Sequence, residues 1–183
     1  MSATKVDANY RFIAASNELN ARIAQRQQAL SLYITLVLGL LAALVAFRPD
    51  NPAQRVPVEW LVLGFPVSSL CLVFLNYKIE RALTNLRSFL STLERLDNAH
   101  NALPSYNTDP QWSDGANRAR RFHDYTAAIL VATSNAVAVG ALLRIYPLQA
   151  QLDSPAVWLT GLVTLGSVGA LLWMPRLSYR PQV

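Results

Sequence analysis

The densest group of ionisable residues lies between positions 118 and 124, where Arg118, Arg120, Arg121 and His123 precede Asp124. Guanidinium groups bind phosphate and carboxylate oxygens, so this cluster predicts contact with an anion. Two sources of that anion stay open: lipid headgroups, or a soluble ligand such as a nucleotide or a phosphorylated metabolite. Neighbouring residues on a helix point about 100° apart, so we do not expect His123 and Asp124 to form an acid–base dyad.

A second polar group lies in the middle of an apolar stretch. Asn135 is an amide surrounded in sequence by Ala, Val, Ser and Thr, and Ser68, Thr160 and Thr164 lie in other apolar stretches. An amide in hydrocarbon needs hydrogen-bond partners, so we expect Asn135 to face other helices rather than lipid. Two interpretations stay open: hydrogen bonds that hold helices together, or the lining of a polar pore or ligand site.

The chain contains none of the common catalytic patterns. A Ser/His/Asp set, an HExxH pair, a CxxC pair and a glycine loop for phosphate are all missing from the sequence. The sequence therefore predicts a protein that is not an enzyme and that has neither a cofactor nor a metal site. The one cysteine, Cys71, lies in an apolar stretch and is predicted to be a small buried apolar residue.

The fold class follows from the apolar residues, which make up 52% of the 183 positions and fall into four blocks. Each block is close to the roughly 20 residues that an α-helix needs to cross the hydrocarbon core of a bilayer. The sequence predicts an all-α integral membrane protein: a four-helix bundle extended in the cytoplasm by a helical hairpin or coiled coil. The predicted spans run over residues 29–47, 60–77, 125–143 and 156–174.

The basic residues predict the orientation. Of the 16 lysines and arginines, thirteen fall in the N-terminal, central and C-terminal segments, and three, Arg48, Arg55 and Arg144, fall in the two remaining loops. Four spans place these two groups on opposite faces, and loops rich in Lys and Arg stay in the cytoplasm. The prediction is a multi-pass protein of the inner membrane with both termini inside. The net charge of +5 serves orientation, so we expect no nucleic-acid partner.

Apolar residues continue beyond the second span at spacings of four and three. Such an a/d pattern is typical of a helix that packs lengthwise against another helix. Its partner is either the N-terminal helix of the same chain, through Phe12, Leu19, Ile23 and Leu30, or a second copy of the protein. The seam comprises Ile79, Leu83, Leu86, Leu90 and Leu93.

The third span carries a small residue at every fourth position. Ala128, Ala132, Ala136 and Gly140 form a small-xxx-small ridge on one face. Such a ridge lets a neighbouring helix come close, within the bundle or in an oligomer.

A turn-rich loop is expected over residues 98–113, with Ser113 and Asp114 capping the helix that follows. The predicted segments are a cytoplasmic amphipathic helix at 1–28, a transmembrane hairpin at 29–77, a cytoplasmic stalk and loop at 78–124, a second transmembrane hairpin at 125–174 and a cytoplasmic tail at 175–183.

An N-terminal helix, a membrane hairpin and a long cytoplasmic helix, in that order, resemble the SLATT-type membrane effectors of bacterial defence systems. The resemblance covers roughly the first half of the chain, and the two further spans depart from it. It implies a self-associating antiviral effector that forms a pore or perturbs the bilayer when triggered from the cytoplasm. The alternative is a scaffold or accessory subunit whose stalk docks a cytoplasmic protein. The expected partners are the lipid bilayer, further copies of the chain and a cytoplasmic protein.

Overall fold

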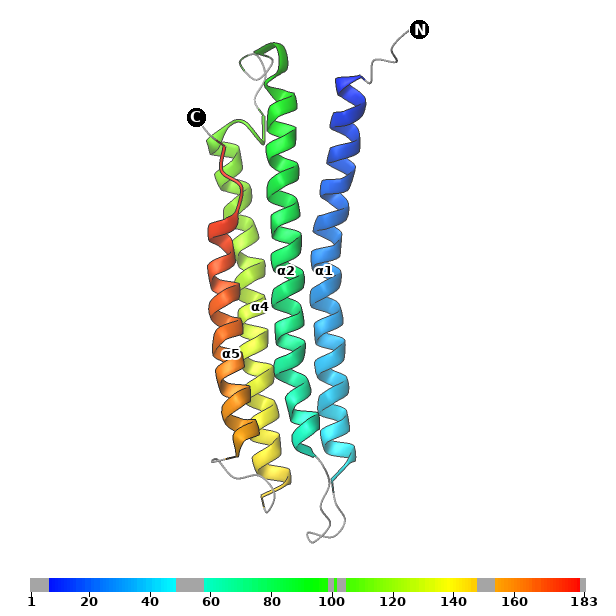
Figure 1. Cartoon of the computed structure of the whole chain (residues 1–183), viewed down its shortest axis with the longest axis vertical. Coiled ribbons are helices and arrows are strands. Elements are labelled where there is room, and N and C mark those ends of the chain that lie inside the picture. Colours follow the sequence, from blue (N-terminus) through cyan, green and yellow to red (C-terminus); the bar gives the residue numbers. More distant parts are fainter. Residues whose placement is uncertain (1–6, 49–57, 99–100, 102–104, 148–153, 182–183) are drawn as a thin grey trace.

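The computed structural model describes residues 7–48, 58–98, 101, 105–147 and 154–181. In these residues the chain forms four long α-helices that lie side by side in one elongated bundle (Figure 1). Two short 3-10 helices, η1 and η2, follow α2 and α5. The elements are α1 Ala8–Ala46, α2 Val58–Glu94, η1 Leu96–Asn98, α4 Pro110–Ile145, α5 Pro155–Trp173 and η2 Met174–Leu177.

The predicted all-α, multi-pass architecture is confirmed. All four helices are long and apolar enough to cross a membrane. In lipid a helix satisfies its own backbone hydrogen bonds, which is why uninterrupted apolar stretches of this length fold as helices. At about 1.5 Å per residue, α1, α2 and α4 are each well over the roughly 30 Å of hydrocarbon core, so part of each helix extends outside it.

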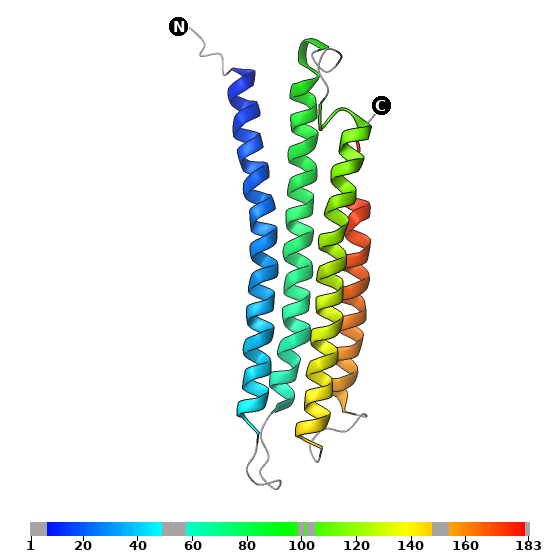
Figure 2. The ribbon, with the colours of Figure 1, turned by 180° about the vertical axis from the view of Figure 1, so that it is seen from behind.

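The helices pack as two antiparallel pairs. α1 lies along α2, and α4 lies along α5, while α2 also contacts α4 and α5 and so holds the centre of the bundle. The contact between α1 and α4 is small. Seen from both sides, the first turn of α1, η1 and the described residues that follow η2 lie toward the same end of the bundle, which we call the terminal end (Figures 1 and 2).

The seam of α2 is partly covered by the chain itself. Ile79, Leu83 and Leu90 are buried, whereas Leu86 and Leu93 are half-buried. The same face of α2 also buries Glu80 and Arg87, so the helix does not present a purely apolar stripe. A coiled coil between copies of the protein stays a prediction.

The small-residue ridge of α4 only starts inside the bundle. Ala128 is buried and Ala132 half-buried, but Ala136 and Gly140 are exposed on the surface of the single chain. The face of α4 that packs inside the bundle instead contains Asn135, which is buried.

Two local predictions were wrong. Cys71 is exposed on α2 rather than buried, because Leu72 and Val73 occupy the inner face at that level. The helix α4 begins earlier than expected: Asp109 is its N-cap, and its side chain accepts a hydrogen bond of 2.8 Å from the amide of Gln111. Pro110 then fills the first helical turn, where its missing N–H costs nothing.

Gly64 of α2 lies in tight contact with the Leu40 side chain of α1. A Cβ at this position would lie 3.0 Å from Leu40 Cδ2, whereas a Cβ at Gly161 of α5 would meet nothing within 4 Å. We expect Gly64→Val to lower the free energy of unfolding by about 1–3 kcal/mol, because added bulk pushes packed helices apart. Gly161→Val is the matched control. Thermal unfolding in detergent, followed by circular dichroism, measures both; equal melting temperatures would contradict the packing.

Candidate functional site

Four charged side chains, three of them buried and one half-buried, lie together at the terminal end of the apolar region. Arg26 of α1 forms ion pairs with Asp124 of α4 and, at 3.7 Å, with Glu80 of α2. Arg120 of α4 forms an ion pair with the same Glu80 oxygen, Oε2. We call these four residues the charge cluster. It joins three of the four helices and contains two positive and two negative groups.

The position of the charge cluster follows from the sequence around it. Arg26 precedes the first apolar stretch by three residues, Glu80 follows the second by three, and Asp124 directly precedes the third. Antiparallel helices that start and end at one membrane surface bring these positions to one level. Burying a single charge costs free energy. The charges at this level offset that cost for one another only when all of them are present.

Burial affects Arg120, which lies outside the apolar stretches. Desolvation lowers the pKa of its guanidinium to about 10, nearby Arg26 lowers the pKa further, and Asp124 raises it. Arg120 therefore remains charged at neutral pH.

Further from the membrane, a second buried arginine organises the loop before α4. Arg87 Nη1 donates to Asn117 Oδ1 at 3.1 Å, and Arg87 Nε donates to Asn107 Oδ1 at 3.4 Å. Its guanidinium carbon also lies 5.4 Å from the centre of the Tyr179 ring. Desolvation lowers the pKa of Arg87, and Tyr179 and Glu94 partly oppose that shift.

The C-terminal segment closes this region. Asn117 Nδ2 donates to the carbonyl of Tyr179 at 2.9 Å, and the Tyr179 hydroxyl donates to the carbonyl of Asn107 at 3.0 Å. Thr84 Oγ1 donates to the carbonyl of Leu177 at 3.0 Å. The segment after α5 is thus tied to α2, to α4 and to the loop between them.

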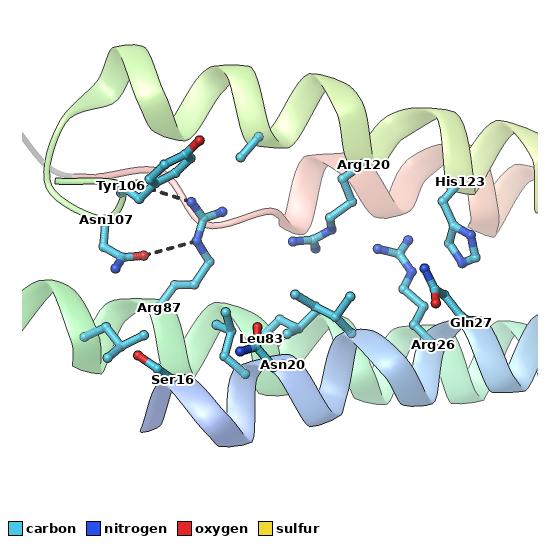
Figure 3. A pocket seen from close by; sticks show the side chains of 14 residues that line it. Ser16, Asn20, Arg26, Gln27, Leu83, Arg87, Tyr106, Asn107, Arg120 and His123 are labelled. Carbon is cyan, nitrogen blue, oxygen red and sulfur yellow. Dashed lines mark hydrogen bonds between the residues drawn. The ribbon is translucent and has the colours of Figure 1, made fainter. Parts of the chain in front are cut away.

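A cavity of about 610 Å³ lies between α1, α2 and α4 at the terminal end. Arg26, Arg87, Arg120 and His123 line it, together with amide and apolar side chains (Figure 3). Arg26 and His123 lie toward one end of the cavity, Arg87 lies toward the other, and the Arg120 side chain lies between Arg87 and Arg26 (Figure 3). The Nε2 atom of His123 is buried without a hydrogen-bond partner among the described residues.

Deeper in the apolar region, a neutral polar layer joins the same three helices. The Tyr33 hydroxyl of α1 lies 2.6 Å from Ser134 Oγ of α4 and 3.3 Å from Ser69 Oγ of α2. Asn135 Nδ2 donates to Ser69 Oγ at 2.9 Å and to the carbonyl of Val131 at 2.8 Å. Asn135 therefore faces the bundle, and its hydrogen bond to Ser69 joins α4 to α2.

The other predicted intramembrane polar residues do not reach Asn135. Ser68 and Thr164 each donate to a carbonyl of their own helix, Gly64 and Thr160 respectively. Thr160 Oγ1, Asn135 Oδ1 and both side-chain polar atoms of Asn76 are buried without a hydrogen-bond partner in the described part of the chain. Asn76 lies between the polar layer and the charge cluster along α2.

The predicted anion-contact residues divide into two groups. Arg120 and His123 line the cavity, whereas Arg118 and Arg121 are exposed and do not line it. The sequence pattern did not predict that Arg26, Glu80 and Arg87 belong to the site. A signal for Glu80 and Arg87 existed, since each directly follows one apolar seam residue and lies three residues before the next.

The chain matches no known family model, no curated protein and no solved structure. Among the residues that the structure describes, no three His, Cys, Asp or Glu side chains come together in a group that could hold a metal ion.

We expect Asp124→Asn to lower the free energy of unfolding by about 3–5 kcal/mol, since it leaves the positive charge of Arg26 buried without its closest partner. Asp114→Asn, at an exposed position of the same helix, is the control and should change little. Thermal or denaturant unfolding in detergent micelles measures the difference. Equal stability of the two variants would show that the charge cluster does not hold the helices together.

Proposed function

We propose that the chain is a non-enzymatic membrane effector that self-associates and perturbs the bilayer when a signal reaches its cytoplasmic end. One observation carries this proposal: the cavity shares Arg26 and Arg120 with the ion pairs that join α1, α2 and α4 where their apolar stretches meet the aqueous side. An occupant of the cavity would therefore act on the contacts that set the arrangement of the membrane helices.

The weak contact between α1 and α4 supports a change of arrangement. Among the hydrogen bonds and ion pairs of the described side chains, two join these helices, Arg26 with Asp124 and Tyr33 with Ser134. An occupant that draws Arg26 away from Asp124 leaves a buried carboxylate unpaired, which is unfavourable in the original packing. The bundle can respond by moving α1, and a two-state response of this kind links a binding site to distant helices.

The exposed part of the α4 ridge supports self-association. Ala136 and Gly140 face outward, and a Cβ at Gly140 would meet nothing within 4 Å. Small residues on a lipid-facing surface allow helices of two chains to approach closely. In this proposal the neutral polar layer holds the single chain closed, and bilayer perturbation requires several chains.

The proposed orientation places the terminal end in the cytoplasm of the inner membrane. It rests on the sequence, in which thirteen basic residues fall in the N-terminal, central and C-terminal segments and three in the two remaining loops. In a Cys71→Ser background, we expect a cysteine at Trp112 to react with a membrane-impermeant maleimide only after the cells are opened. A cysteine at Arg48 should react in intact cells. The reverse labelling pattern would invert the topology.

The effector proposal predicts leakage when the α1–α4 ion pair is removed. The double variant Arg26→Gln with Asp124→Asn keeps the net charge of the charge cluster and mimics release of α1. We expect vesicles that contain it to lose an entrapped dye, whereas vesicles with the unaltered protein stay tight. Adding Gly140→Leu should reduce the leakage by blocking close contact between chains.

The matched control removes an ion pair from the same helix outside the site, through Arg22→Gln with Glu18→Gln. It should leave vesicles tight. If the Arg26 and Asp124 variant inserts normally and causes no more leakage than this control, the effector proposal fails.

The alternative function is a scaffold, and one observation favours it. The first turns of α1 lie beyond the apolar stretch and expose Tyr10 and Ile13 by 70% and 59%. A cytoplasmic protein that docks there would cover them. Tyr10→Ser with Ile13→Ser separates the two functions, since it should abolish docking in a scaffold and leave leakage by the effector unchanged.

A further inference from the structure

The cavity presents positive charge without the compensating carboxylates. Three guanidinium groups lie among its lining side chains, together with the imidazole of His123, whose pKa is lowered by burial. Among the residues that the structure describes, no Asp or Glu lines the cavity. Glu80 and Asp124 are 1% and 2% exposed and pair with the arginines without lining the cavity. An occupant therefore meets cations directly, and the desolvated carboxylates only behind them.

Arg87 is the least compensated of the three arginines. Its hydrogen bonds go to neutral oxygens of Asn107, Asn117, Tyr106 and Ser113, at 3.1 to 3.5 Å. These distances are long for a charged donor, which prefers roughly 2.7–2.9 Å to an anionic oxygen. An anion in the cavity would offer Arg87 a stronger acceptor than any it now contacts.

The rest of the lining suits an organic body attached to the anion. Leu19, Ile23, Leu83 and Leu90 provide apolar contact, and Asn20 and Gln27 provide neutral polar groups. A volume of about 610 Å³ lies within the range of roughly 300–1,000 Å³ typical of pockets that enclose a small molecule.

We propose that this cavity binds the phosphate group of a small organic molecule between Arg87 and Arg120, with the organic part against the leucine-rich wall. The inference rests on the proposed function in one respect, since it gives the signal a chemical class. A soluble phosphate compound and the headgroup of a lipid share this chemistry. Guanidinium groups favour phosphate because their planar fork can donate two parallel hydrogen bonds to it.

The test uses the full chain in nanodiscs of zwitterionic phosphatidylcholine and calorimetric titration with sodium pyrophosphate, AMP and adenosine. We expect pyrophosphate and AMP to bind and adenosine to bind at least tenfold more weakly. Arg87→Gln should weaken AMP binding at least tenfold. Arg120→Gln combined with Glu80→Gln, which removes one positive and one negative charge together, should do the same. Ala116→Phe, which fills the cavity without changing a charge, is the variant to use if Arg87→Gln fails to fold.

Arg118→Gln and Arg121→Gln are the matched controls, because both lie on α4 near Arg120 but are exposed and outside the cavity. They should keep AMP affinity within about twofold if no general surface charge is involved. An equal loss in the controls and the cavity variants would overturn the inference.

The lipid arm repeats the titration with nanodiscs that contain phosphatidylglycerol. Two results together would show that the bound phosphate belongs to a lipid headgroup. The soluble probes would bind only in the zwitterionic discs, and phosphatidylglycerol would raise the melting temperature of the unaltered protein but not of the cavity variants. If neither source has an effect that depends on Arg87 and Arg120, the inference is wrong. If AMP binds but the ion-pair variant causes no leakage, this inference stands and the proposed function fails. If the ion-pair variant causes leakage but no phosphate binds, the proposed function stands and this inference fails.

Discussion

The arrangement of this protein depends on a group of two arginines and two carboxylates, of which Arg26, Glu80 and Asp124 are buried and Arg120 is half-buried. A single buried charge costs several kcal/mol, so neither Arg26 nor Glu80 is tolerable in this position without its partners. The pairing fixes how far α1, α2 and α4 are shifted along one another, because sliding one helix by a turn would separate the charges. Apolar side chains in the membrane region do not give such a unique register, since one leucine contact can replace another.

The four helices could be predicted from the sequence because each apolar stretch is long enough to be recognised by itself. Local errors were small and had local causes: Asp109 caps α4 in place of Ser113, and Cys71 falls on the outer face of α2. The site was harder to predict. Arg26 and Asp124 are 98 positions apart, and the sequence around either residue does not indicate that the two form an ion pair. The sequence predicts Arg120 and His123 as anion contacts because they lie in a dense cluster of basic residues. For the same reason it also predicts the exposed Arg118 and Arg121.

Polar residues on the buried face of α2 explain why its leucine pattern alone did not predict how the helix packs against its neighbours. Glu80 and Arg87 lie one heptad apart among Ile79, Leu83 and Leu90, and both are buried. A polar group in an apolar seam lowers stability but restricts the partners and registers that the seam accepts. The part of α2 beyond the membrane therefore packs against particular polar groups of α4 and the preceding loop, and its leucines supply the remaining contact.

The hydrogen bonds of Tyr179 have a consequence for the biosynthesis of this protein. Tyr179 follows all four helices in chain order, yet it contacts Asn107, Asn117 and Arg87 around the cavity. During translation the four helices leave the ribosome before Tyr179 does, so the contacts of Tyr179 with Asn107, Asn117 and Arg87 form after the helices have been made. Arg87, Asn107 and Asn117 therefore gain these partners only after the residues of all four helices have been synthesised.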